Sequence, residues 1–207
     1  MKIIITGFNA FGNIKINPSE RVVQMVSGLS RSWGFSELKT EVLRTEFEYA
    51  GNRIEELIKN EKPDILLLLG VAMGGLEIRL ERLADNVNLL SVPDNTKRCI
   101  NQKEVIVGGP INYLSSLPIF QIKSALERND IPVRISYDAG KYVCNHVFYK
   151  AIDTIDKLEL NTFCGFIHIP LVSEYLSENL IKYPSISEAK VLEAIKITLD
   201  EINSQVA

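Results

Sequence analysis

Hydrophobic residues form short continuous runs that alternate with helical stripes along this chain. The runs at 2–6 (KIIIT) and 65–70 (ILLLLG) each reach a glycine at their end, which is typical of buried strands. Between them, the segment 46–60 (EFEYAGNRIEELIKN) places Ile54 and Ile58 on one face. That spacing predicts an amphipathic helix, so a strand, a helix and a second strand follow one another.

The same periodicities extend this alternation to the rest of the chain. Residues 91–113 contain prolines and two adjacent glycines, and they are predicted as a long loop of the kind that often carries function. The last helix is expected to begin with a capping box formed by Ser185 and Glu188. Further helices are predicted at 19–29, 118–130 and 143–155, and further strands at 40–45, 76–82, 132–137 and 164–170.

Strands that alternate with helices predict an α/β fold. We expect a single α/β/α domain over residues 1–207, with a mostly parallel central sheet flanked by helices. In sheets of this kind the active site lies at the carboxyl ends of the strands. Functional residues are therefore expected at those ends.

Composition and charge argue against several classes of protein. The formal net charge is −3, and no stripe of Lys and Arg is interleaved with aromatic residues, so we expect no nucleic-acid partner. No apolar segment approaches the ~18 residues of a membrane span, and the first apolar run is too short for a signal peptide. We therefore expect no membrane partner and a cytoplasmic location. Three cysteines without a CxxC pair and only two histidines argue against a structural zinc site.

Two glycine-rich segments resemble phosphate-binding loops without matching them. In 6–12 (TGFNAFG) the glycine spacing is that of a P-loop, but neither Lys nor Ser or Thr follows Gly12. The segment 70–75 (GVAMGG) is not GxGxxG either, so both are interpreted as tight turns. Phe8 and Phe11 follow the first strand, and we expect their rings near the active site rather than in the core.

Cys144 has the placement of a nucleophile. It follows the predicted strand 132–137 and lies in the first turn of the helix 143–155, where backbone N–H groups and the helix dipole favour a thiolate. The same strand–turn–helix placement exposes the nucleophile of α/β hydrolases. A buried thiol that only packs the core is the alternative, and position alone leaves both open. Cys99 and Cys164 lack this placement and are expected to be structural.

A thiol nucleophile needs a base, and the chain offers two histidines. His146 lies two residues after Cys144, roughly opposite it around the helix, and is expected to pack or to face solvent. His168 lies near the carboxyl end of the strand 164–170, where it could reach a neighbouring strand-to-helix loop. A histidine satisfied within the core would occupy the same position.

The base in turn needs an acceptor that orients it. The strand 76–82 alternates strictly, with Leu76, Ile78 and Leu80 on the side expected to be buried and Glu81 near its end on the other side. That position gives Glu81 the best claim. The remaining carboxylates are expected in loops or in solvent: Asp85, Asp94 and Asp138.

Five segments together resemble one family. They are TGFNAFG with NPSE, ERLADNV, PDN, AGKYVCNHVFY and GFIHIP, and they span nearly the whole chain. In this order and at this spacing they resemble the pyroglutamyl peptidase I (pyrrolidone-carboxylate peptidase) family of cysteine peptidases.

The resemblance assigns roles to three residues. It implies that Cys144 is the nucleophile, His168 the general base and Glu81 the carboxylate that orients His168. It further implies hydrolysis of an N-terminal pyroglutamyl residue from peptides through a pyroglutamyl-enzyme intermediate. The family uses no metal or cofactor and is commonly homotetrameric.

Pyroglutamate is a compact lactam without a positively charged amine, so its pocket needs flat apolar walls and a few hydrogen bonds. By the resemblance, Phe8 and Phe11 flank the lactam ring. Backbone N–H groups at the start of the helix 143–155 are expected to hold the oxyanion. Further residues expected to line the pocket are Thr45, Val71, Val92, Tyr142 and Val143.

Two positions depart from the family pattern. Gly75 and Ser91 stand where many relatives carry arginine. Neither departure touches the three residues that would carry the reaction, so an active peptidase is expected. The alternatives are a repurposed relative with an altered substrate, or a non-catalytic α/β domain that binds a small molecule and merely buries Cys144.

Overall fold

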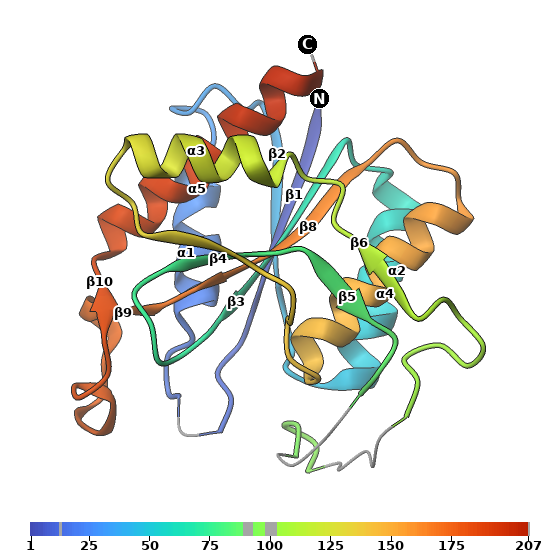
Figure 1. The fold of residues 1–207 in the computed structure, drawn as a ribbon, viewed down its shortest axis with the longest axis horizontal. Helices are drawn as coiled ribbons and strands as arrows, with labels where there is room; N and C mark the ends of the chain where they lie inside the picture. The colour runs from blue at the N-terminus through green and yellow to red at the C-terminus, as the bar shows by residue number, and fades with distance from the viewer. Residues whose placement is uncertain (13, 89–92, 98–102, 207) are drawn as a thin grey trace.

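The computed structural model describes residues 1–12, 14–88, 93–97 and 103–206 (Figure 1). Its principal sheet contains six strands in the order β2-β1-β3-β8-β4-β7. These strands are β1 (Lys2–Phe8), β2 (Glu37–Leu43), β3 (Ile65–Val71), β4 (Ile78–Glu81), β7 (Val133–Ser136) and β8 (Phe163–Ile169). Two small ribbons pair β5 (Leu83–Asp85) with β6 (Asn112–Leu114), and β9 (Leu171–Val172) with β10 (Ser185–Ile186).

The sheet consists of two blocks that run in opposite directions. Strands β2, β1, β3 and β8 are mutually parallel, and β4 and β7 are parallel to each other. The two blocks meet where β8 pairs antiparallel with β4. The predicted α/β class with a mostly parallel central sheet is confirmed. Strands β4 and β7 run against the other four, so their carboxyl ends lie at the opposite edge of the sheet.

Five helices of the described chain cover the two faces of the sheet (Figure 1). Apolar side chains on one face, such as Ile3 and Leu67, pack in one cluster with residues of α1, α3 and α5. The intervening residues, such as Ile4 and Leu66, pack on the other face with α2 and α4. This alternation follows from the period of two in a strand, and it builds one core on each side of the sheet. The helices are α1 (Pro18–Leu29), α2 (Phe47–Glu61), α3 (Ile119–Arg128), α4 (Val143–Lys157) and α5 (Glu188–Val206).

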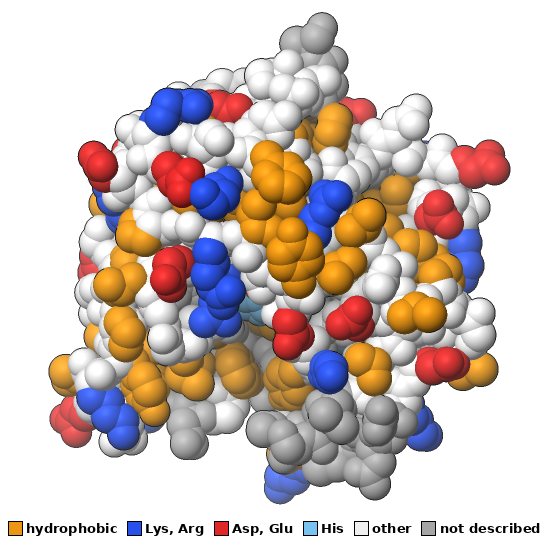
Figure 2. Space-filling model, viewed as in Figure 1, with side chains coloured by type: hydrophobic (Ala, Val, Ile, Leu, Met, Phe, Trp, Pro, Cys, Tyr) orange, Lys and Arg blue, Asp and Glu red, His pale blue; other side chains and the backbone are white. Residues whose placement is uncertain are grey.

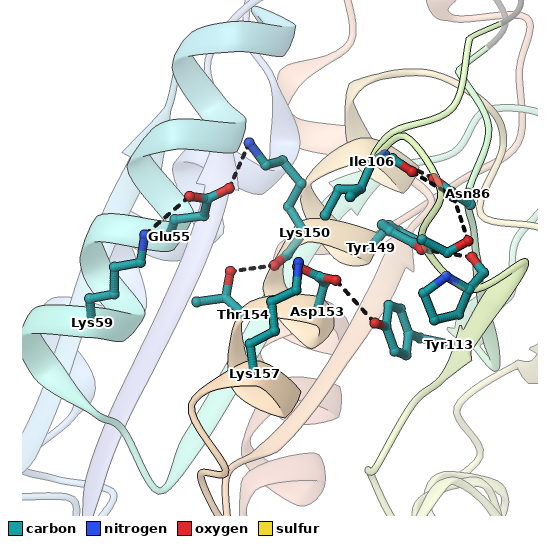
Figure 3. Close-up of polar contacts among 12 residues, drawn as sticks. Glu55, Lys59, Asn86, Ile106, Tyr113, Tyr149, Lys150, Asp153, Thr154 and Lys157 are labelled. Carbon is teal, nitrogen blue, oxygen red and sulfur yellow. Dashed lines mark hydrogen bonds and ion pairs between the residues drawn. The ribbon is translucent and has the colours of Figure 1, made fainter.

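Polar contacts as well as apolar packing join α2 to α4 (Figure 3). The Glu55 carboxylate accepts from Lys150 of α4 at 2.7 Å and from Lys59 of its own helix at 3.3 Å. On the other side of α4, the Tyr113 hydroxyl of β6 donates to Asp153 at 3.0 Å. Helix α4 is therefore held between α2 and the β5–β6 ribbon.

The strand predicted at 76–82 begins and ends differently. Leu76 is 44% exposed and precedes β4, which starts only at Ile78. The chain then continues beyond Arg82 into β5. Residues 112 and 113, predicted as loop, belong to β6, because they pair with β5.

Helix α5 begins at Glu188, two residues later than a cap at Ser185 predicts. Ser185 belongs to β10, and Ser187 precedes the helix. The Ser187 hydroxyl accepts a hydrogen bond from the backbone N–H of Lys190 at 3.3 Å, while Glu174 accepts from the Glu188 N–H. The predicted capping box of Ser185 and Glu188 is therefore wrong, because the short β9–β10 pairing holds Ser185.

The helices and the exposed apolar side chains of the described residues bear on membrane binding and self-association. None of their helices combines the length and the apolar character needed to cross a membrane. Apolar side chains gather near the middle of one face (Figure 2). Large hydrophobic residues that are more than half exposed include Ile111, Leu114, Phe120 and Tyr137.

Candidate active site

His168 and Glu81 meet where the two blocks of the sheet join. In the antiparallel register, Arg79 lies opposite His168 and Glu81 lies opposite Phe166, so all four side chains project from one face. The His168 ring reaches diagonally to Glu81, and its Nδ1 lies 2.8 Å from Glu81 Oε1. Because a carboxylate only accepts, Nδ1 carries a proton in this bond. Both residues are buried, so water competes little for this contact.

Cys144 approaches the same histidine from helix α4. The helix begins at Val143, and Cys144 lies in its first turn, partly exposed. A Cβ atom added to Gly70, which pairs with His168 in the sheet, would lie 3.1 Å from the Cys144 sulfur. The absence of a side chain at Gly70 therefore leaves the space into which the sulfur projects. Cys144 lies close enough to the imidazole of His168 to raise its pKa, and the contact to Glu81 leaves the Nε2 of that ring free.

The environment of His168 favours the imidazolium. Burial by itself lowers the pKa of His168, but the hydrogen bonds to Cys144 and Glu81 and their negative charges outweigh it. The net effect raises the pKa of His168 to about 9. At neutral pH the ring can therefore hold a proton between a sulfur and a carboxylate.

His146 faces away from this group. Its Nδ1 lies 3.2 Å from Asn88 Oδ1, its ring packs edge-on against Phe47, and a Cβ atom on Gly51 would meet its Nε2. Burial and the charge of Lys150 lower the pKa of His146 to about 3, against the opposing charge of Glu55. From the sequence, His146 is expected to pack or to face solvent rather than to act as the base for Cys144, and this placement agrees with that expectation.

Phe8, which ends β1, and Phe11, in the loop that follows, lie in different surroundings. Phe8 is 2% exposed and stacks on Phe166 within the core cluster of α2 and α4, so the expectation that it lies outside the core is wrong. Phe166 nevertheless links the Phe8 ring to His168, since the Phe166 ring contacts both. Phe11 is partly exposed, and its ring lies 6.2 Å from that of Tyr142.

The other expected pocket residues surround the same region. The Tyr142 hydroxyl donates to the Pro93 carbonyl at 3.2 Å, and its pKa is raised to about 12 by burial and by the charges of Asp94 and Cys144. Thr45 is buried and bonded to Asn9. Val71 and Phe11 pack against the same small apolar cluster, whereas Val143 is fully buried. Val92 lies outside the described residues.

The remaining candidates are not drawn into this group. Asp94 accepts from the Phe47 N–H at the start of α2, and Asp138 accepts from the Gly140 N–H. The backbone of Asp85 is bonded to Asn145. Burial raises the pKa of the Cys164 thiol, while Cys99 lies outside the described residues. Among the residues described, no three His, Cys, Asp or Glu side chains are grouped as a metal would require.

The two departures from the family pattern have different outcomes. Gly75 is partly buried, and a Cβ atom there would meet only the flexible end of Glu77 at 2.7 Å. The backbone at that position therefore accepts a larger residue if the Glu77 side chain moves. Ser91 lies outside the described residues.

Sequence reasoning missed two residues that shape this site. Gly70 was interpreted as a turn, although its close approach to Cys144 is what the site requires. Asn145 went unnoticed, although its side chain is 1% exposed and bonded on every polar atom. A helix-disfavouring Asn within an apolar helical segment was the available signal.

A thiol at a helix N-terminus beside a buried histidine–carboxylate pair is the arrangement of the cysteine hydrolases. Residues 1–205 match the family model described as pyroglutamyl peptidase. This chain belongs to the pyroglutamyl peptidase family.

Two curated relatives are both called pyrrolidone-carboxylate peptidase. The protein of Oceanobacillus iheyensis is 39% identical over 96% of this chain and 97% of its own length. That of Pyrococcus furiosus is 34% identical over 97% of each chain. A solved structure of a variant pyrrolidone carboxyl peptidase from Pyrococcus furiosus covers all of both chains with a TM-score of 0.92 and 32% identity.

Proposed function

We propose that this protein is a cysteine exopeptidase that hydrolyses the N-terminal pyroglutamyl residue from peptides. The single observation that carries the proposal is that Cys144 lies beside the hydrogen-bonded pair of His168 and Glu81. Family membership supports the substrate class, and the match over residues 1–205 supports one catalytic domain over residues 1–207.

The three side chains would divide the reaction as follows. The Cys144 thiolate attacks the pyroglutamyl carbonyl carbon, and the protonated His168 gives its proton to the leaving amine as the C–N bond breaks. Neutral His168 then takes a proton from water, which attacks the thioester and releases pyroglutamate and the Cys144 thiolate. Glu81 keeps the imidazole in one tautomer and orientation throughout. No metal or cofactor is needed for these steps.

The start of α4 offers donors for the developing oxyanion. Tyr142 precedes the helix and provides no side-chain cap to it, so N–H groups of the first turn are available near Cys144. Together with the helix dipole they would stabilise negative charge on the carbonyl oxygen.

The lactam would lie between the first turn of α4 and the loop that follows β1. Phe11 and Tyr142 supply partly exposed rings, and Phe8 supports the wall from the core. Val71 adds an apolar edge at the end of β3. Thr45 and Val143, both buried, would support these walls from behind. Such walls suit a flat, uncharged ring.

The proposal extends to the cellular location and the oligomeric state of the protein. A free Cys144 thiol agrees with a reducing compartment, so we place the enzyme in the cytoplasm. The exposed apolar side chains near the middle of one face agree with a homo-oligomer, a tetramer by family resemblance (Figure 2). Sedimentation of the purified protein measures the assembly directly.

The function is tested with a pyroglutamyl amide that releases a chromophore on hydrolysis. We expect turnover by the wild-type protein, inhibition by iodoacetamide, and no turnover by Cys144→Ala or His168→Ala. A folded wild-type protein without turnover would overturn the proposal, as would full turnover by Cys144→Ala. A thermal shift with a nucleotide and no hydrolysis would point to a binding domain instead.

A further inference from the structure

Asn145, the residue after Cys144, joins the helix of the proposed nucleophile to the strand that continues from Glu81. Its Oδ1 accepts from the backbone N–H of Asp85 at 2.9 Å. Its Nδ2 donates to the carbonyls of Asp85 at 2.8 Å and Val87 at 3.0 Å. The amide thus pairs with both backbone groups of Asp85, as a neighbouring strand would, and both of its N–H bonds are used.

Successive side chains at the start of α4 point in three directions, since each residue of a helix is turned by about 100°. Cys144 projects toward Gly70 and His168 on the sheet. Asn145 projects toward β5 and His146 toward α2. The three contacts therefore fix the rotation of the helix about its own axis.

The two halves of the proposed triad are held by different means. Glu81 and His168 lie on paired strands, so backbone hydrogen bonds of the sheet set their distance. Cys144 lies on a helix, which apolar residues such as Val143 and Val147 press against the sheet. The ion pair of Lys150 and the hydrogen bond of Asp153 also hold α4, but both lie more than one turn away from Cys144. At the first turn, apolar packing is non-directional and leaves sliding and rotation weakly restrained, whereas hydrogen bonds are directional.

We infer that Asn145 is a positioning residue, whose three backbone hydrogen bonds hold the Cys144 sulfur in register with His168. The inference rests on the proposed function. A displacement of about 1 Å in reacting groups can cost roughly 10²-fold in rate. The loss of Asn145 should therefore lower kcat far more than it changes KM.

Asn86 provides a matched control on the same strand segment. It is 8% exposed and likewise makes three backbone hydrogen bonds, to Ile106 in both directions and to the Gly109 carbonyl (Figure 3). These bonds attach the loop at 106–109 and do not involve α4. The same loop contacts α4 at Tyr149, more than one turn from Cys144. Asn86→Ala therefore removes the same number and kind of buried bonds without a direct contact to the first turn of α4.

The experiment compares Asn145→Ala with Asn86→Ala in the oligomeric protein as purified. We expect both variants to lower Tm by a similar amount, roughly 3–10 °C. Only Asn145→Ala should lower kcat, by roughly 10–100-fold, with KM little changed. It should also slow the alkylation of Cys144 by iodoacetamide, because a displaced sulfur loses the imidazolium that stabilises its thiolate.

Equal kcat losses in the two variants, or wild-type alkylation in Asn145→Ala, would overturn the inference. If Asn145→Ala does not fold, Asn145→Asp takes its place, because it keeps the oxygen that accepts from Asp85 and loses both donors. Alkylation needs no substrate. A wild-type protein without turnover therefore refutes the proposed function, while the alkylation rates still decide the role of Asn145.

Discussion

His168 and Glu81 are diagonal neighbours on antiparallel strands, and their side chains meet at 2.8 Å. The reversal of β4 relative to β8 is what makes this contact possible. It places Glu81 two residues from the position opposite His168, on the same face of the sheet. The carboxylate is 1% exposed, and its Oε2 has no hydrogen-bond partner among the described residues. Its charge therefore acts on the imidazole with little screening.

Glu81→Gln should shift the alkaline limb of the pH profile of kcat/KM. The pKa of His168 is held at about 9 partly by Glu81, and the proton on His168 is the one that the leaving amine needs. Removal of the carboxylate charge lowers that pKa, so the limb should shift to lower pH, and kcat/KM should fall by roughly 10²-fold. The pH dependence of kcat/KM measures both, with the exposed Glu77→Gln as control. An unchanged limb in Glu81→Gln would refute the coupling.

His146→Gln should leave the pH dependence as it is. The pKa of His146 is lowered to about 3, so this ring stays neutral over the working range. Glutamine keeps a donor toward Asn88, which limits the loss of packing. We expect both limbs at their wild-type pH and a much smaller loss of kcat than in His168→Gln. A shifted limb would mean that His146 takes part in proton transfer.

The pattern of the sequence predicted which segments form the strands and helices, because burial imposes its period on them. The apolar runs of β1 and β3 and the stripe of α2 lie within a residue or two of their predicted bounds. Cys144 and His168 stood out because each follows or ends a strand. Strand direction was not predictable, since parallel and antiparallel partners impose the same alternation on β4 and β7.

The residues that sequence reasoning missed matter because of contacts that form only in the folded chain. Gly70 matters because of the atom it lacks beside Cys144, and only the packing of α4 on β3 reveals that. Ser185 and Ser187 have the same side chain, and the pairing of β9 with β10 decides which of them precedes α5. Such choices are made by tertiary contacts, so a local pattern leaves them open.

Gly70→Ala should impair both folding and catalysis. The added methyl would lie 2.8 Å from Phe166 Cζ and 3.1 Å from the Cys144 sulfur, so one of them must move. We expect a loss of about 1–3 kcal/mol in unfolding free energy and a lower kcat, measured by denaturant unfolding and by the amide assay. Gly28→Ala is the control, because a Cβ there meets open space in α1. Wild-type kcat in Gly70→Ala would show that the sulfur needs no such space.

Ser187→Ala should destabilise the protein more than Ser185→Ala. Ser187 accepts from the Lys190 N–H in the first turn of α5, and loss of such a cap costs about 1 kcal/mol. Among the described residues, the Ser185 hydroxyl has one hydrogen-bond partner, the exposed Ser173 hydroxyl. Thermal unfolding should show a Tm lowered by about 2–4 °C for Ser187→Ala and less for Ser185→Ala, with kcat unchanged in both. The opposite order of Tm would restore Ser185 as the cap.

Brief alkylation of the native protein should distinguish Cys144 from Cys164. Cys144 is partly exposed in the first turn of α4, beside the imidazole of His168. Cys164 is 1% exposed, and burial raises the pKa of its thiol, which keeps it protonated. We expect iodoacetamide to label Cys144 in step with the loss of activity, and to reach Cys164 only after unfolding. Peptide mass spectrometry measures both sites. Activity that survives complete labelling of Cys144, or native labelling of Cys164 at the same rate, would contradict the assignment of Cys144 as the nucleophile.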